Sequence, residues 1–387
     1  MKFSYIFIGV LLRFILFLFF PCPIITAITT CKNNLNCSLN GFCKNGICIC
    51  DKPWGGSRCG VLQYKLNQPV TARNLYPHND SDAPKSGPCV TPSDSCRALN
   101  TWNGPIIYTN KKYHMFNPLY KRGSLLQTQD MLHGIATNIT GPYKWHSQNQ
   151  GNMGSNPAFV SFQDVNTNVT KYSLWVGGNI YVSDDINGYF EKINSPHFSN
   201  PAPIFYKGKW YATDQTTTKI LTTDKLGGTW THYADINVKL DRGVQEDPFM
   251  WVDRRANWHI INHAYDTNEY THCGKSTVSA HLFSQDNGKT WFMLQNPNVE
   301  PYSHTVSYED GTTHTYTTLE RPNCHFNEKG EMTHINLAAD LMTQDAGCKS
   351  YAICPAKTKI GNYCACTNCK YADHAGTIII ALDVCEK

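Results

Sequence analysis

Charge is scarce in this chain of 387 residues. Asp, Glu, Lys and Arg make up only 17% of it, and the formal net charge is +4. Proteins that bind nucleic acids neutralise phosphates with clustered Lys and Arg, and the sequence has no such surplus. We therefore expect no nucleic-acid partner.

Sustained helical periodicity is also missing. From about Trp102 onward, short runs of Tyr, Trp, Phe, Val, Ile and Thr alternate with Gly, Asn and Asp turns. Such runs are typical of short β-strands joined by tight turns. The pattern argues against a helical fold and predicts that this part of the chain is all-β.

One long apolar run is present, at the N-terminus. Residues Tyr5 to Phe20 are almost wholly apolar, follow Lys2, and lead into small residues at Ala27. This layout is typical of a signal peptide, which we place at residues 1–27. The alternative is an uncleaved membrane anchor, against which Arg13 argues because a charge in mid-bilayer is costly. We expect a secreted, extracellular protein.

Two further features agree with secretion. The 17 cysteines would pair in an oxidising compartment, and cleavage near Ala27 would remove Cys22 and leave 16. Four Asn-x-Ser/Thr sequons predict N-glycosylation. They begin at Asn36, Asn79, Asn138 and Asn168.

The segment 31–59 is too short to build a hydrophobic core, so cross-links must hold its fold together. It holds six cysteines, at 31, 37, 43, 48, 50 and 59. Six cysteines allow 15 pairings, and Cys-x-Cys can also hold zinc, although a secreted chain favours disulfides. We expect no metal and no other cofactor. Residues 60–97, rich in Pro, Ser, Asp and Asn, are interpreted as a linker or cover segment.

Cys48-Ile-Cys50, followed by Pro53-Trp54-Gly55-Gly56 and Cys59, resembles the C-terminal signature of EGF-like domains. The resemblance implies the pairs Cys31 to Cys43, Cys37 to Cys48 and Cys50 to Cys59. It also implies a spacer or adhesion unit that could contact extracellular proteins.

A repeat runs through residues 98–387. Each copy has a polar residue, a proline, an apolar strand, a turn and an aromatic strand. The prolines lie at 105, 157, 201, 248 and 322, so the gaps are 52, 44, 47 and 74 residues. Four short strands per unit of about 40 to 50 residues suit a propeller blade. We predict a five-bladed β-propeller, with a β-sandwich as the alternative. An insertion around residues 296–317 explains the longest gap and is a candidate pocket edge.

Other motifs of this region are interpreted as structural. Residues Ser284 to Trp291 resemble the Asp-box turn of sialidases, and Thr223 to Trp230 is a looser copy. His114 and His259 occupy the same repeat position, which favours a structural role for both. Residues Ala375 to Leu382 are expected to form the last strand of the ring. Disulfides are expected among the C-terminal cysteines, at 348, 354, 364, 366, 369 and 385.

The first strands of all blades start at one mouth of a propeller's channel, so the residues before each proline should converge there. These are Asn103 and Gly104, Ser155 and Asn156, Ser199 and Asn200, Glu246 and Asp247, and Glu320 and Arg321. Acids and amides bond hydroxyl groups, and aromatic rings can cover apolar ligand faces. We predict a carbohydrate site whose binding residues are Trp102, Asn103, Asn156, Asn200 and Arg321.

The order of these motifs resembles the five-bladed propellers of glycoside hydrolase family 43. The resemblance covers about Trp102 to Leu341. It is carried by Asn200-Pro201-Ala202-Pro203-Ile204, Glu246-Asp247-Pro248-Phe249-Met250-Trp251 and Glu320-Arg321-Pro322. It implies inverting hydrolysis of a glycosidic bond, with Glu320 as general acid and Asp247 as the residue that tunes its pKa.

One family feature is missing. The family's general base is an Asp on the first blade, where this chain reads Thr101-Trp102-Asn103-Gly104-Pro105. Glu246 is a candidate displaced base, and Asp130 is a second. A general base contributes about 10²- to 10⁴-fold to the rate. Two hypotheses therefore stand: a glycosidase that acts on a polysaccharide or glycan, and a catalytically inactive carbohydrate-binding or adhesion protein.

Overall fold

A computed structural model gives the fold. It describes residues 31–67, 100–120, 128–147, 151, 153–238, 244–265, 277–294, 300–316, 319–340, 359–360, 363–364 and 375–384. The expected signal segment 1–27, the sequon at Asn79 and most of the expected linker lie outside these residues. So do Cys89, Cys96, Cys273, Cys348, Cys354, Cys366, Cys369 and Cys385.

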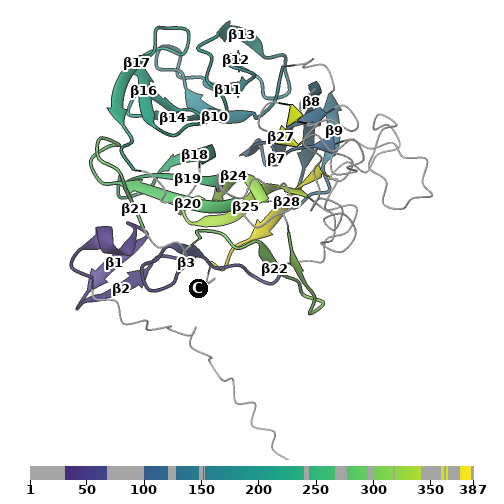
Figure 1. Cartoon of the computed structure of the whole chain (residues 1–387). Helices are drawn as coiled ribbons and strands as arrows, with labels where there is room; N and C mark the ends of the chain where they lie inside the picture. Colours follow the sequence, from purple (N-terminus) through teal and green to yellow (C-terminus); the bar gives the residue numbers. More distant parts are fainter. Residues whose placement is uncertain are drawn as a thin grey trace, which may run out of the picture.

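The described residues between 100 and 384 contain the five blades of a propeller, as predicted (Figure 1). The first blade contains β6 (Ile106–Thr109), β7 (Lys112–Tyr120), β8 (Thr128–Ala136) and β9 (Lys144–Ser147), and β5 (Asn100–Thr101) pairs with the far end of β7. The second contains β10 (Ala158–Gln163), β11 (Thr170–Val176), β12 (Asn179–Ser183) and β13 (Glu191–Asn194).

The third blade contains β14 (Ala202–Tyr206), β15 (Lys209–Thr213), β16 (Lys219–Thr223) and β17 (Thr231–Asp235). The fourth contains β18 (Val244–Val252), β19 (Trp258–Tyr265), β20 (Thr277–Ser284) and β21 (Phe292–Met293). The fifth contains β24 (Leu319–Phe326), β25 (Met332–Asp340) and β28 (Ala375–Ala381). Adjacent strands within each blade are antiparallel. The last strand that the sequence predicted, at Ala375 to Leu382, is β28, which pairs with β25 as the third strand of the fifth blade.

Every blade has a kink at the predicted repeat position. The backbone is left-handed there, with φ between 44° and 58°, at Asn103, Asn156, Asn200, Asp247 and Arg321. A proline follows each kink within two residues, and proline has no N–H to continue the strand ladder. The pairing register accordingly shifts at this point in β18 and β24.

The kink of the first blade also requires glycine. A Cβ atom on Gly104 would lie 1.7 Å from the carbonyl oxygen of Phe116, so no other residue fits against β7.

Apolar side chains fill the spaces between blades. Trp258 is fully buried between the third and fourth blades, and Trp175 packs with Trp210 between the second and third. At the outer turns, Asp286 accepts hydrogen bonds from Ser284 and from the backbone N–H groups of Lys289 and Thr290, which is the Asp-box arrangement expected there.

The turn from Ser183 to Phe190 is a further, related copy. The hydroxyl of Ser183 donates to the carbonyl of Asp185, as that of Thr223 does to Lys225. Phe190 occupies the place that Trp takes in the other two copies, and the sequence pattern therefore did not reveal it.

Amide side chains join the first blade to the fifth. The side-chain N–H groups of Asn103 donate to the carbonyls of Arg321 and Asn336, and Asn336 donates in return to Asn103 and to the carbonyl of Gly104. The ring is thus closed at its inner edge by reciprocal side-chain bonds.

The N-terminal segment is a disulfide module, here residues 31–59. It contains η1 (Asn34–Cys37), β1 (Gly41–Lys44), β2 (Ile47–Cys50) and β3 (Trp54–Gly55), and β4 (Val61–Leu62) pairs with β3. Its disulfides join Cys31 to Cys43, Cys37 to Cys48 and Cys50 to Cys59, the pairs that the resemblance implied. Of the described residues, η1 is the one helical segment, and it is too short to cross a membrane.

The disulfide module packs against the propeller. It lies beside the fourth and fifth blades (Figure 1), and Trp54, Cys59 and Leu62 share one core with Trp251 and Leu337. Backbone bonds run from Leu62 N–H to Pro301 O and from Lys65 N–H to Ala381 O. The sequence predicted a spacer or adhesion unit and gave no indication that the module packs against the propeller.

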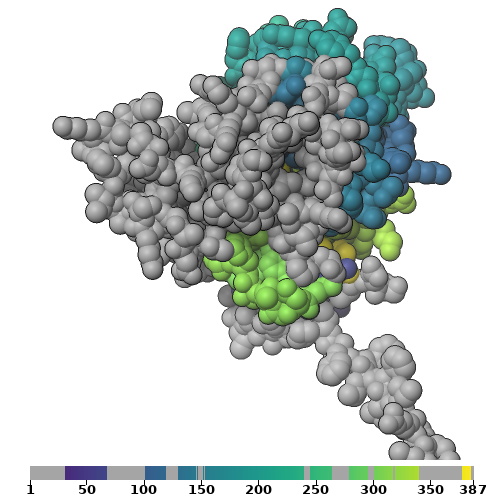
Figure 2. All heavy atoms as spheres, turned by 90° about the vertical axis from the view of Figure 1, so that its right-hand side faces the viewer, coloured from purple at the N-terminus to yellow at the C-terminus, as the bar shows by residue number. Residues whose placement is uncertain are grey.

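The insertion before the fifth blade contains the hairpin of β22 (Thr305–Ser307) and β23 (Thr313–Thr315). Its Tyr308 forms a parallel β-bridge with Asn67. In Figure 2 the green residues beyond 300 lie below the teal blades. A separate hairpin joins β26 (Lys359–Ile360) to β27 (Tyr363–Cys364).

Candidate functional site

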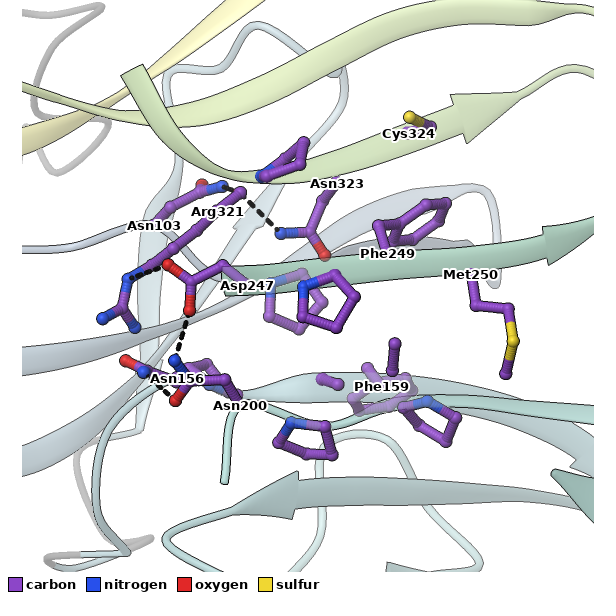
Figure 3. Close-up of a pocket in the computed structure, with 18 of the residues that line it drawn as sticks. Asn103, Asn156, Phe159, Asn200, Asp247, Phe249, Met250, Arg321, Asn323 and Cys324 are labelled. Atoms are coloured by element: carbon purple, nitrogen blue, oxygen red, sulfur yellow. Dashed lines mark hydrogen bonds and ion pairs between the residues drawn. The ribbon is translucent and has the colours of Figure 1, made fainter. Parts of the chain in front are cut away.

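The kinked residues converge on a cavity of about 150 Å³ in the central channel. All five first strands line it, which is the convergence that the proline spacing predicted. Figure 3 shows a polar end and an apolar end: Asp247, Arg321 and three asparagines gather at one, and Phe159, Phe249 and Met250 lie at the other. The polar end is the mouth at which the candidate site residues meet.

Asp247 is the central carboxylate of the mouth. Its side chain is 4% exposed, and its Oδ2 lies 3.4 Å from Nε of Arg321 and 3.4 Å from Nδ1 of His263. Asn200 donates to its Oδ1. Burial raises the pKa of Asp247, and the Arg321 cation and the Asn200 hydrogen bond oppose that rise.

Glu320 precedes Arg321 and is 9% exposed. Burial raises the pKa of Glu320 to about 8, and the nearby charge of Asp247 adds to the rise. Arg321 and a hydrogen bond from Trp102 act in the opposite direction. Glu320 is therefore mostly protonated at neutral pH, as a general acid must be.

Glu246 precedes Asp247 and is held by two amides. Gln215 and Asn200 both donate to its Oε1. Its Oε2 lies 3.8 Å from Nε2 of His263, a ring that is fully buried. Burial lowers the pKa of His263 to about 3, so the imidazole is neutral and can donate only one N–H to the two carboxylates beside it.

Two residue groups in the described part of the chain bring three potential metal ligands together. One is Asp247, His263 and Glu320, whose ligand atoms all lie within 4.8 Å of one another. Arg321 already places a positive charge beside Asp247, which disfavours a cation there. The other group is Cys31, Cys37 and Cys48, and these sulfurs are in disulfides.

The predicted sugar-binding residues have different surroundings. Asn156 and Asn200 line the cavity, and Asn156 donates to Asn200. Arg321 also lines it. Asn103 lies at the same mouth, but its amide bonds the fifth blade. Trp102 is only 4% exposed and hydrogen-bonds Glu320.

Several candidates lie away from the cavity wall. Glu246 and Glu320 are next to it in sequence but are not among the residues that line it. Asp130 lies on β8 and accepts the N–H of Met131. The sequons at Asn138 and Asn168 are exposed, and Asn36 is partly buried in η1.

The sequence analysis identified neither Gln215 nor His263 as a site residue. Gln215 follows β15 in a polar turn, Asp214-Gln215-Thr216, that gives no signal of a bond to Glu246. His263 alternates with His259 and Ile261 along β19, a pattern typical of a buried strand face. Its pairing with Glu246 across β18 is what places it at the mouth.

No protein-family model matches the sequence, and a comparison with curated proteins finds no match. Solved structures do match. An alpha-L-arabinofuranosidase of Podospora anserina in complex with cellotriose is 12% identical, with a TM-score of 0.52 over 77% of this chain and 96% of that one. The catalytic domain of a GH62 alpha-L-arabinofuranosidase of Coprinopsis cinerea is also 12% identical, with a TM-score of 0.52 over 77% and 95%.

A GH62 hydrolase in complex with xylotriose is 10% identical, with a TM-score of 0.51 over 77% of this chain and 96% of that chain. At sequence identities this low, a structural match establishes the fold alone. The propeller of this chain thus has the architecture of GH62 glycoside hydrolases.

Proposed function

We propose that this protein is an extracellular glycoside hydrolase that cleaves a polysaccharide or glycan by inverting hydrolysis. Glu320 is the general acid that protonates the leaving oxygen, and Asp247 keeps the pKa of Glu320 high. The observation that carries the proposal is the buried Glu320 carboxyl, with a pKa raised to about 8 beside the Asp247 carboxylate. Protonation of the leaving group requires such an acid.

The spacing of the carboxyl groups supports these roles. Oxygens of Asp247 and Glu320 lie within 4.8 Å of each other. An inverting pair needs about 6.5 to 9.5 Å so that a water fits between the carboxyl groups. Asp247 is therefore too close to activate that water, and close enough to act on Glu320 through its charge.

Glu246 is the proposed base. It is partly exposed, with 17% of its side chain accessible, and Gln215 and Asn200 fix its Oε1. Its Oε2, which lies 3.8 Å from Nε2 of His263, is the oxygen proposed to accept a proton from water. Substrate would lie across the mouth, against Glu246 and Glu320, with Asn156, Asn200 and Arg321 as hydrogen-bonding groups.

Sugar release tests the proposal. The purified protein is incubated with arabinoxylan, arabinan, xylo-oligosaccharides and cello-oligosaccharides, beside the variant Glu320→Gln and the control Glu328→Gln at a distant turn. We expect release by the wild type and the control, and a loss of at least about 10²-fold in Glu320→Gln. Release that survives Glu320→Gln with the fold intact would contradict the site assignment.

The alternative is a carbohydrate-binding or adhesion protein without turnover. It is favoured by the asparagines at the kink position of three blades, where the first-blade position would carry the family's base. Oligosaccharide binding measured by calorimetry without any sugar release would favour this alternative, and Arg321→Ala should weaken such binding.

The extracellular placement is a proposal as well. It rests on the apolar leader 1–27, on the four sequons and on the three disulfides, which persist in oxidising compartments. An EGF-like identity of the disulfide module rests on its pairing pattern. Mass spectrometry of the secreted protein, before and after removal of N-glycans, tests the cleavage site and the occupied sequons.

A further inference from the structure

Two pairs of buried histidines occupy equivalent places in different blades. In the fourth blade, Nδ1 of His259 on β19 lies 3.0 Å from Nε2 of His281 on β20. In the first blade, Nδ1 of His114 on β7 lies 3.0 Å from Nε2 of His133 on β8. All four side chains are buried. The fourth-blade pair lies under the disulfide module, where Trp54 stacks on His281 with ring centroids 4.8 Å apart.

The outer nitrogens of the two pairs differ. In the fourth blade, Nε2 of His259 lies 3.4 Å from Oδ2 of Asp253, and Nδ1 of His281 lies 3.4 Å from the amide nitrogen of Asn40 in the module. The corresponding nitrogens of the first-blade pair have no hydrogen-bond partner among the described residues. In the fourth blade, the module and the β18–β19 turn thus supply a hydrogen-bond partner at each end of the histidine pair and complete a chain of hydrogen bonds. The first-blade pair has no such partners among the described residues.

The completed chain has a single direction. Asn40 donates one amide hydrogen to the carbonyl of Cys59, at 3.0 Å, which fixes the orientation of its side chain. Its other hydrogen faces Nδ1 of His281, so that atom must accept. His281 then carries its proton on Nε2 and donates to His259, which in turn donates from Nε2 to Asp253.

We propose that this chain of hydrogen bonds, from Asn40 through His281 and His259 to Asp253, is an acid-sensitive latch. It holds the disulfide module on the fourth blade and releases it when a histidine is protonated. A proton added to either imidazole must leave His281 with an N–H on Nδ1, facing the N–H of Asn40. Two donors then meet in a buried place, and the contact is lost. Opening of the seam lets the charged ring reach water.

Burial keeps both rings neutral while the module is docked. Burial lowers the pKa of His281 well below 6.5, and the neighbouring His259 adds to this. Burial also lowers the pKa of His259, against Asp253, which favours its charged form. Arg255 opposes a charge on His259 and Asp51 favours one, but these two lie 2.7 Å apart and are paired with each other.

The direction of the pH effect follows from these shifts. Once exposed, His281 would titrate near its usual 6.5, so below that pH the open form holds more protons than the docked form. Falling pH therefore favours opening, by up to about tenfold per pH unit for each histidine that gains water.

Hydrogen exchange on the full chain, with its disulfides intact, tests the latch. The readout is the protection of the amides of Leu62 and Lys65, after correction for intrinsic exchange between pH 7.5 and 5. These residues directly follow the module and bond Pro301 and Ala381, so their protection falls when the module and the adjoining segment leave the propeller. The amides of β14 to β17 are the internal reference. We expect the seam to open more below pH 6.5 in the wild type and to lose this dependence in His281→Phe. The matched first-blade variant His133→Phe should keep the wild-type dependence.

A second variant decides the case in which His281→Phe prevents docking at every pH. In Asn40→Asp a carboxylate faces Nδ1 of His281 and can accept from the charged ring, so acid should tighten the seam instead of opening it. A wild-type seam that stays equally protected from pH 7.5 to 5 would overturn the proposal. So would an unchanged pH dependence in His281→Phe, or the wild-type direction in Asn40→Asp.

Discussion

Each of the five kinked residues at the channel mouth has the same left-handed backbone and a different chemical task. Asn103 bonds the neighbouring blade, Asn156 and Asn200 form an amide chain, Asp247 holds the negative charge, and Arg321 lies beside it. Among residues other than glycine, asparagine and aspartate tolerate this conformation best. Arg321 does not, so the packing around it must hold the backbone in place.

Burial of Glu320, together with the Asp247 charge, is expected to set the upper pH limit of activity. Glu320 donates only when protonated, so sugar release should fall as pH rises through about 8. In Asp247→Asn the raising effect of the Asp247 charge is gone, and we expect the limit to move to lower pH. A pH–rate profile measures this, with Asp310→Asn in an exposed turn as the control. An identical limit in wild type and Asp247→Asn would show that the two carboxyls do not interact.

For single residues, the sequence predicts which ones lie at the channel mouth better than it predicts which side chains they contact. Proline spacing located all five mouth residues, because the kink depends on a local backbone rule. It could not show that Trp102 is buried against Glu320 or that Gln215 bonds Glu246. Those contacts join different blades, and local patterns carry no information on them.

Among the elements, the junction of the first and fifth blades depends on one amide. Asn103 donates two hydrogen bonds to backbone carbonyls, and a carboxylate at this position could donate neither. Ring closure therefore accounts for an Asn, in place of a carboxylate, at this position.

We expect Asn103→Asp to lower the free energy of unfolding by about 1–3 kcal/mol or more for each carbonyl left unpaired. Urea unfolding, with the exposed Asn166→Asp as control, measures the change. If Asn103→Asp were as stable as the wild type and gained hydrolytic activity, the position would instead be a catalytic site that has lost its base.

Strand patterns show the same limit in another form. The Asp box of the fourth blade was recognisable because Asp286, Gly288 and Trp291 all match the motif. The turn ending at Phe190 bonds similarly through Ser183, although its aromatic residue differs. Hydrogen bonds to the backbone define such a turn, and a residue pattern captures them only when every side chain is retained.

For the whole molecule, the disulfide module is an integral part of the propeller's outer side. Asn40 and His281, which meet at the seam, lie 241 residues apart in the chain. Lys52 and Asp383 meet at 2.9 Å across a separation of 331 residues. Contacts this distant follow from the tertiary fold, so the sequence indicated a module but not its attachment.

Loss of one disulfide should loosen the module while leaving the blades intact. Cys37 and Cys48 close a short loop, and removal of such a bond from a small domain costs about 2–5 kcal/mol. In Cys37→Ser with Cys48→Ser we expect faster hydrogen exchange across residues 31–59. Exchange in β14 to β17 should not change. Equal exchange across residues 31–59 in variant and wild type would mean that packing on the propeller alone holds the module.

The central claim is that a protonated Glu320 stands beside the Asp247 carboxylate at the channel mouth. Carbon NMR of the full protein with carboxyl-labelled glutamate, assigned with Glu320→Gln, measures its titration directly and needs no substrate. We predict that the Glu320 signal titrates near pH 8, far above the usual 4.5 for glutamate. Titration of Glu320 near 4.5 would contradict the account, because the carboxyl would then be ionised at neutral pH and could not serve as the acid.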